Sequence, residues 1–131
     1  MELPFELDRL DHVALTVSDV DRSIEWYRNV LGLEHVHEEE WGRNPAFLTS
    51  GTTGVALFPA QSSDPPPPGS HPGGLAMWHL AFRADRRTFD AAKEDLSARD
   101  IRYTFSDHGI AHSIYFHDPD GHLLEITTYE V

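Results

Sequence analysis

The chain has 131 residues and a formal net charge of -12, from 10 Lys and Arg against 22 Asp and Glu. A chain of this length builds one continuous core, and its negative charge disfavours nucleic acid and anionic membrane surfaces as partners while attracting cations. Because the sequence has no cysteine, thiolate ligands, disulfides and a thiol nucleophile are excluded, and any metal must be held by nitrogen and oxygen.

The first half of the chain predicts a strand, a helix and three further strands. Residues 10–17 alternate between apolar and polar positions, which predicts a strand with His12 on its polar face. The helix is expected to begin after Ser18 or Asp19, both good N-caps, and to end at Gly32. The three further strands are expected at residues 33–40, 46–50 and 55–59.

A proline-rich segment follows this first module. Residues 59–74 hold six prolines and three glycines, which deny the segment helical and ladder hydrogen bonds. We expect a stiff linker over residues 60–74, either a plain connection between modules or one that also borders a pocket as a lid.

The second half repeats the pattern of the first. A strand carrying His79 is expected at residues 77–84 and a helix at 86–99, and Asp-Pro-Asp-Gly at 118–121 is typical of a turn. The remaining strands are expected at residues 102–106, 111–117 and 122–129. The repeat predicts an α+β fold of two paired βαβββ modules, about 8–59 and about 75–131, within one domain spanning 1–131.

Three candidate metal ligands lie on the polar faces of three predicted strands. His12 and His79 occupy equivalent places in the two modules, and Glu125 is a carboxylate in an otherwise apolar strand. Two imidazoles and one carboxylate leave open coordination positions on a six-coordinate metal, as in non-haem iron sites. Taken alone, each of these residues is more often a packed or surface side chain. Arg83 shares the predicted face of His79 and could pair with a substrate anion or with an acidic neighbour.

The chain resembles a known family in three segments: DHVALTVSDVDRSIEWYRNVLGL at 11–33, MWHLAF at 77–82 and YFHDPDGHLLEI at 115–126. They are similar to the signature segments of the vicinal oxygen chelate superfamily, which includes glyoxalases, bleomycin resistance proteins and extradiol dioxygenases. The resemblance implies that His12, His79 and Glu125 hold one divalent metal in a half-barrel covered outside by helices, the glyoxalase/dioxygenase-like fold. Fe2+ or Mn2+ is the favoured metal, and Ni2+, Co2+ and Zn2+ fit the same donors.

The resemblance leaves the reaction open, because members share the scaffold and differ in chemistry. Glyoxalase I has a fourth, carboxylate ligand where this chain has Ala56, and fosfomycin-modifying enzymes have a basic residue after the last ligand, which is missing after Glu125. The extradiol signature matches His108 and Tyr115, which would be the catalytic acid-base residues.

The first hypothesis for the reaction is therefore an extradiol-type ring-cleaving dioxygenase. The alternatives are a glyoxalase-like lyase or isomerase, a fosfomycin-type transferase or hydrolase, and a non-catalytic antibiotic-binding protein of the bleomycin-resistance kind. His35, His37 and Trp41 could border the pocket of any of these or simply face solvent.

The distribution of the ligands bears on assembly. His12 belongs to the first module, whereas His79 and Glu125 belong to the second, so one chain or two chains can complete a site. Related single-domain enzymes often share sites between chains, and the stiff linker favours that arrangement. We expect a homodimer with shared metal sites and a small-molecule substrate. Without an apolar run of about 20 residues or a secretory signal, the expected location is the cytoplasm.

Overall fold

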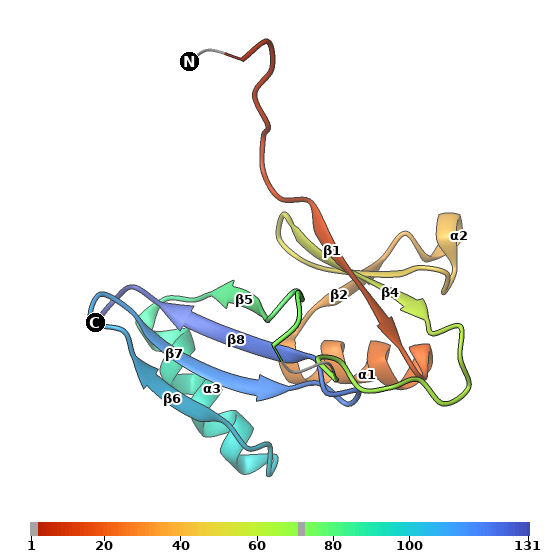
Figure 1. Ribbon diagram of the computed structural model, residues 1–131. Coiled ribbons are helices and arrows are strands. Elements are labelled where there is room, and N and C mark those ends of the chain that lie inside the picture. Colours follow the sequence, from red (N-terminus) through yellow and green to blue (C-terminus); the bar gives the residue numbers. More distant parts are fainter. Residues whose placement is uncertain (1–2, 71–72) are drawn as a thin grey trace. The chain divides into compact units, whose positions relative to one another are not determined.

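The computed structural model describes residues 3–70 and 73–131 and divides into two compact units, Met1–Pro65 and Pro66–Val131. In each unit, one α-helix of three or more turns packs on one face of a four-stranded sheet (Figure 1). The boundary between the units falls inside the proline-rich segment, of which residues 71–72 lie outside the described residues. Within the described ranges, every helix is too short or too polar to cross a membrane.

Unit 1 contains four strands and two helices. They are β1 (His12–Val17), α1 (Val20–Leu31), β2 (Glu34–Val36), α2 (Glu38–Trp41), β3 (Ala46–Ser50) and β4 (Thr53–Pro59). The strand order is β1-β4-β3-β2, with β1 parallel to β4 and the other neighbours antiparallel. The sheet thus places β1, the strand of His12, at one edge.

Helix α1 ends where its caps predict. Asp19 is the N-cap, and its side chain accepts a hydrogen bond of 3.0 Å from the Arg22 amide. Gly32 ends the helix in the left-handed conformation at φ 68°, which glycine adopts without strain. Between these ends Ile24 and Tyr27 are buried as the helix packs on β2, β3 and β4. The helix therefore leaves the opposite face of the sheet for a site.

The strand expected at residues 33–40 is wrong beyond its first half. Strand β2 stops at Val36, and His37 takes a left-handed conformation at φ 59°, which a ladder cannot continue. The next residues form the short helix α2, whose first turn is made of three glutamates. Carboxylates are favourable at a helix N-terminus, so this acidic run favours the helix over a strand.

Unit 2 repeats the topology of unit 1. It contains β5 (Leu80–Arg83), α3 (Arg86–Ala98), β6 (Thr104–Asp107), β7 (His112–His117) and β8 (Leu123–Thr128). The strand order is β5-β8-β7-β6, with β5 parallel to β8, as β1 is to β4. The predicted α+β fold of two repeated modules is confirmed. Strand β5 is shorter than expected, so His79 directly precedes it instead of lying within it.

The hairpin between β7 and β8 fixes the register of the second sheet. The Asp118 carboxylate accepts hydrogen bonds from the amides of Asp120 and His122, at 3.0 and 2.9 Å. Gly121 completes the turn at φ 90°, a conformation that L side chains rarely adopt. This turn sets Tyr115 directly opposite Glu125 on the neighbouring strand.

Candidate metal centre

His79 and Glu125 form the centre of the site in unit 2. Nε2 of His79 lies 2.9 Å from Oε1 of Glu125, and the glutamate is only 7% exposed. Two donors about 2.1 Å from one metal and at right angles to each other lie about 3 Å apart. The pair therefore already has the spacing of two adjacent ligands of a divalent cation.

Tyr115 and His108 extend this centre along the sheet. The ring of Tyr115 packs edge-on against His79, with centroids 5.6 Å apart, and its hydroxyl lies 3.1 Å from Nε2 of His108. Burial, and then the neighbouring Glu125 carboxylate, raise the pKa of the Tyr115 phenol above its usual value. A phenol in this setting keeps its proton at neutral pH and can donate it. Glu125, His79, Tyr115 and His108 thus form one connected cluster.

His12, the third predicted ligand, begins β1 in unit 1. Its Nδ1 lies 2.9 Å from the Asp11 carboxylate, and its ring packs edge-on against Phe47 at 5.3 Å. A carboxylate at Nδ1 favours the tautomer with the proton there, which leaves the lone pair on Nε2 for a metal. The imidazole is therefore oriented on two sides by its own unit.

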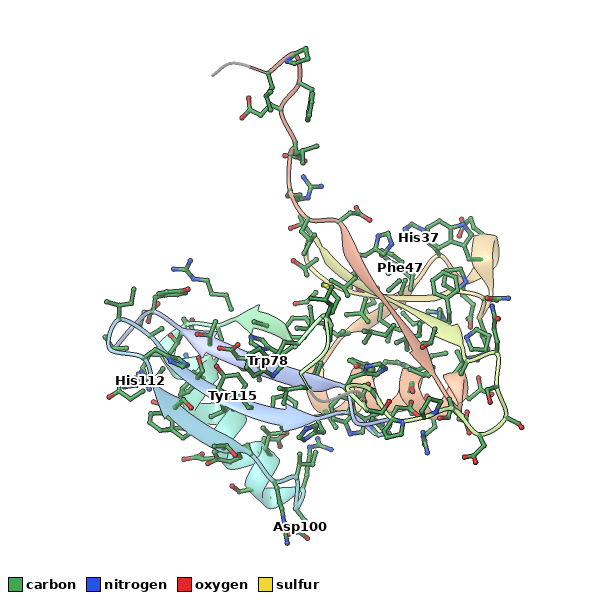
Figure 2. All side chains as sticks on the ribbon, viewed as in Figure 1. His37, Phe47, Trp78, Asp100, His112 and Tyr115 are labelled. Carbon is green, nitrogen blue, oxygen red and sulfur yellow. The ribbon has the colours of Figure 1, made fainter. Side chains whose placement is uncertain are left out.

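An aromatic cluster surrounds Phe47 on the same side of unit 1. Trp41 and His37 lie 5.5 and 6.0 Å from Phe47 between ring centroids, and 5.0 Å from each other. Figure 2 labels His37 and Phe47 of this cluster. The cluster requires Gly54 on β4, because a Cβ there would lie 2.6 Å from the end of the Phe47 ring. His37 and Trp41, two of the three residues suggested as a pocket border, thus pack against Phe47, which in turn packs against His12.

Strand β4 carries no carboxylate on the face of His12. The parallel register sets His12 beside Gly54 and the next two positions of that face beside Ala56 and Phe58. A fourth ligand of the glyoxalase I kind would come from this strand, and Ala56 is buried and cannot supply one. The predicted donor set therefore stays at two histidines and one glutamate, with no fourth ligand from β4.

The described parts of the two units do not bring three metal-binding side chains together. Within residues 3–70 and 73–131, no group of three or more His, Asp or Glu could hold a metal ion. His79 and Glu125 are paired in unit 2, and His12 belongs to unit 1. The donors of each unit fit a divalent metal by spacing and tautomer, and the union of the three remains a prediction.

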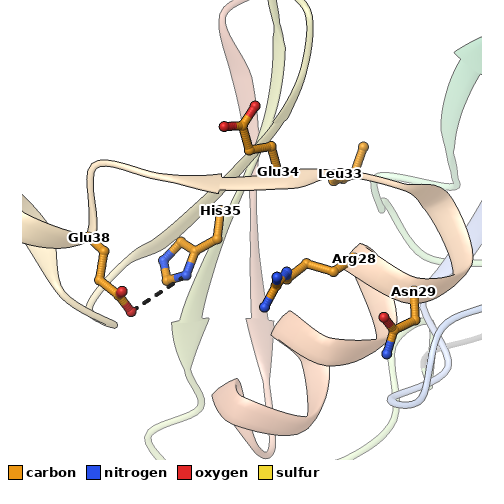
Figure 3. Close-up of a pocket in the computed structure, with 6 residues that line it drawn as sticks. All are labelled: Arg28, Asn29, Leu33, Glu34, His35 and Glu38. Carbon is orange, nitrogen blue, oxygen red and sulfur yellow. Dashed lines mark ion pairs between the residues drawn. The ribbon is translucent and has the colours of Figure 1, made fainter.

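His35 lies apart from this centre. It faces Leu48 across the sheet, one position from the pair of Val36 and Phe47, so its side chain is turned toward the face covered by α1. There it borders a polar hollow, and its Nδ1 lies 3.6 Å from the Glu38 carboxylate (Figure 3). The hollow is lined by Arg28, Asn29, Leu33, Glu34, His35 and Glu38. His35 and His12 therefore lie on opposite faces of the unit 1 sheet.

Sequence reasoning missed three residues that position the predicted ligands. Asp11 holds His12, Phe47 packs on it, and Gly54 makes room for Phe47. An aspartate directly before a candidate histidine was the one visible signal, since ligating histidines commonly donate their second N–H to a carboxylate. Phe47 and Gly54 lie on other strands, and their contacts depend on register.

Comparison with known proteins bears on the family that the three segments resemble. The family model described as the Glyoxalase/Bleomycin resistance protein/Dioxygenase superfamily matches residues 9–126. Metallothiol transferase FosB of Staphylococcus epidermidis is 32% identical over 126 residues, covering 94% of this chain and 83% of the relative. The mitochondrial methylmalonyl-CoA epimerase of Mus musculus is 33% identical over 135 residues, covering 93% of this chain and 74% of the relative.

The fold agrees with solved structures of the same kind. A glyoxalase/dioxygenase from Nostoc punctiforme has a TM-score of 0.78 and 26% identity, with 98% of this chain and 95% of that chain covered. The family match spans both units and all three resembling segments. The chain therefore belongs to the glyoxalase, bleomycin resistance protein and dioxygenase superfamily, the vicinal oxygen chelate proteins.

Proposed function

We propose that this chain is a metal-dependent enzyme acting on a small substrate that chelates the metal through two neighbouring oxygens. The observation that carries the proposal is the cluster in unit 2, where the His79 and Glu125 donor pair lies beside Tyr115 and His108. His79, Glu125 and His12 would hold one divalent metal, with Fe2+ or Mn2+ favoured for this nitrogen and oxygen set.

The residues beside the metal ligands are suited to moving a proton. The bound metal would supply Lewis acidity to the chelated oxygens of the substrate. Tyr115 faces Glu125 across the sheet and its hydroxyl lies 3.1 Å from Nε2 of His108, so it can give a proton to a substrate oxygen or carbon and regain one through His108. His108 is exposed and can exchange that proton with water. The cluster thus connects the substrate position to solvent.

The favoured reaction is an isomerisation, epimerisation or lyase step, because proton transfer by Tyr115 and His108 needs no oxidant. The names of two relatives, an epimerase and a transferase, agree with non-oxidative chemistry. Ring cleavage of a catechol by an extradiol-type reaction is the second candidate. It is favoured by the contact of 3.1 Å between His108 and Tyr115, the two residues that its signature would use.

We further propose that the two units form one vicinal oxygen chelate domain and that the working protein is a homodimer with shared metal sites. The support is the division of the donors, with His12 in unit 1 and His79 and Glu125 in unit 2. In a shared site, His12 of one chain would meet the pair of the other.

Reconstitution with single metals tests the proposal. Protein freed of metal would be loaded with Fe2+, Mn2+, Co2+, Ni2+ or Zn2+ and incubated in D2O with the methylglyoxal hemithioacetal, methylmalonyl-CoA, fosfomycin with a thiol, and catechol with O2. Metal-dependent deuterium uptake or rearrangement supports proton-transfer chemistry, and oxygen consumption with catechol supports ring cleavage. Tight binding of bleomycin without any metal dependence would instead support a passive binding protein and contradict the proposal.

A further inference from the structure

A second row of polar side chains crosses the unit 2 sheet beside the row of the metal ligand. In the first row, Glu125 on β8 faces Tyr115 on β7. Two residues further along β8, Thr127 faces Arg83 on β5 and Ser113 on β7. Side chains two apart in a strand point to the same face, so the second row shares the face of Glu125. The rows are about 7 Å apart along the strands.

Arg83 is a cation with no carboxylate partner among the described residues of a strongly acidic chain. The sequence has 22 Asp and Glu, yet none in the described ranges lies within ion-pair distance of its guanidinium. The guanidinium carbon lies 4.7 Å from the centre of the Tyr129 ring. Stacking on an aromatic face holds the planar group and leaves its N–H edge for oxygen ligands. The N–H edge of the Arg83 guanidinium, held by the Tyr129 ring, therefore lies on the same face of the sheet as Glu125.

The hydroxyl groups of Ser113 and Thr127 lie beside Arg83 and are arranged so that Thr127 can donate a hydrogen bond to an anion bound there. Ser113 is fully buried, and its hydroxyl donates to Oγ1 of Thr127 at 2.9 Å. The Thr127 hydroxyl donates in turn to the backbone carbonyl of His112 at 3.3 Å, a long bond. An anionic oxygen is a stronger acceptor than this carbonyl, so the Thr127 proton can turn to it while Ser113 keeps its own bond.

We infer that Arg83 and Thr127 form a subsite for an anionic oxygen group of the substrate, a carboxylate or a phosphonate. This inference rests on the proposed function, because the same substrate would hold the metal with its chelating end and Arg83 with its anionic end. In a chain with a net charge of -12, a local cation offsets the repulsion that an anionic substrate would meet. The subsite would select doubly functional substrates over neutral analogues of the same length.

Binding of three matched probes to the Mn2+-loaded protein tests the subsite. All three offer the same 2-oxo acid for chelation: 2-oxoglutarate ends in a carboxylate, 2-oxo-4-phosphonobutanoate in a phosphonate, and 2-oxopentanoate in a methyl group. At least one anionic probe should bind about tenfold more tightly than 2-oxopentanoate, as expected for a charge-assisted hydrogen bond. The ratio between the two anionic probes identifies which group the subsite prefers.

The Arg83→Met variant keeps most of the length of the side chain. It should reduce the preference for the anionic probes over 2-oxopentanoate to about onefold, while the amount of bound Mn2+ stays unchanged. Thr127→Val should reduce it partly, and Arg87→Met, which removes an equal charge from the exposed side of α3, should leave it intact. Equal binding of all three probes to the Mn2+-loaded wild-type protein overturns the subsite, as does a preference that survives in Arg83→Met.

A measurement without metal separates this inference from the proposed function. Glutarate is added to metal-free 15N-labelled protein, and the Nε–H signal of Arg83, assigned by its loss in Arg83→Met, is followed. A saturable shift supports the anion subsite even if the protein fails to bind Mn2+, in which case only the proposed function falls. No shift at tens of millimolar glutarate contradicts the subsite, whatever the metal does.

Discussion

Glu125 on β8 and Tyr115 on β7 are direct partners across the second sheet, so a buried carboxylate and a phenol share one position on its polar face. The Asp118 turn maintains this register, and a slip of one residue would turn one of the two side chains to the opposite face. The predicted metal ligand and the candidate proton donor are thus set next to each other by strand pairing. The first two predictions follow from this arrangement.

Removal of His79 should abolish tight metal binding. His79→Ala leaves Glu125 without its neighbouring donor, and metal affinity should fall by more than about 100-fold. Loss of a residue that only hydrogen-bonds to a metal ligand already costs about 10- to 100-fold. Isothermal titration with Mn2+ measures the effect. His112→Ala serves as the control, because His112 lies on the opposite face of the same sheet and should keep the wild-type affinity. Full stoichiometric binding by His79→Ala would remove it from the ligand set.

Replacement of His108 should suppress turnover without loss of metal. His108→Phe removes the group that exchanges a proton with Tyr115, and the rate on a confirmed substrate should fall by about 10²- to 10⁴-fold. Because Tyr115 and His108 act on one proton, the double variant with Tyr115→Phe should be little worse than either single variant. Rates from steady-state assays and metal content by elemental analysis check this. Unchanged turnover in His108→Phe would exclude it from the mechanism.

Mixing two defective chains tests the shared site. His12→Ala and His79→Ala chains each lack one ligand, but in a heterodimer with shared sites one site regains all three and the other loses two. Mixed chains should therefore recover up to one tightly bound metal per heterodimer. Native mass spectrometry reports both the heterodimer and its metal. Heterodimers that form without recovering metal would show that each site is built within one chain.

A methyl group at position 54 should disturb the site of His12. The Cβ of Gly54→Ala would lie 2.6 Å from Cζ of Phe47, and that ring packs on His12. The free energy of unfolding should fall by about 1–3 kcal/mol, as for other overpacked positions, and metal affinity should fall with it. Denaturant unfolding and metal titration measure the two effects. Adding Phe47→Leu to Gly54→Ala should restore part of the stability, and a lack of any rescue would point to a cause other than this contact.

The N-cap of α3 should make a pH-dependent contribution to stability. The amide of Thr88 donates to the Asp85 carboxylate at 2.8 Å, and this backbone hydrogen bond is the main reason that the pKa of Asp85 is lowered. A lowered native pKa stabilises the fold above the unfolded pKa of about 3.9, and this contribution is lost as pH falls through the native value.

Asp85→Asn keeps the capping oxygen but removes the charge. It should therefore unfold more easily than the wild-type protein at pH 7, and the difference should shrink as the pH falls below about 4. Urea unfolding at several pH values follows this difference. A difference that stays constant from pH 7 to pH 3 would contradict a role for the carboxylate charge.

The sequence by itself determined the repeated modules, because caps, turns and apolar alternation are local signals. Asp19 and Gly32 bounded the first helix, and the Asp-Pro-Asp-Gly run formed the last turn, as their chemistry predicts. The sequence also identified four candidate site residues that lie in one cluster in unit 2: His79, Glu125, Tyr115 and His108. The prediction of a strand at 33–40 was wrong beyond Val36 because the alternation of apolar and polar residues there competed with an acidic run that favours the start of a helix.

Only the tertiary structure decided which side chains meet across strands. The pairing of β8 with β5 and β7 set Arg83 and Ser113 beside Thr127, and the absence of a Cβ on Gly54 admitted Phe47 next to His12. These contacts join residues on different strands, and they follow from register and close approach. Local propensity holds no information about either, because a shift of one residue in pairing would leave every strand signal unchanged and turn the side chains of the shifted strand to the other face.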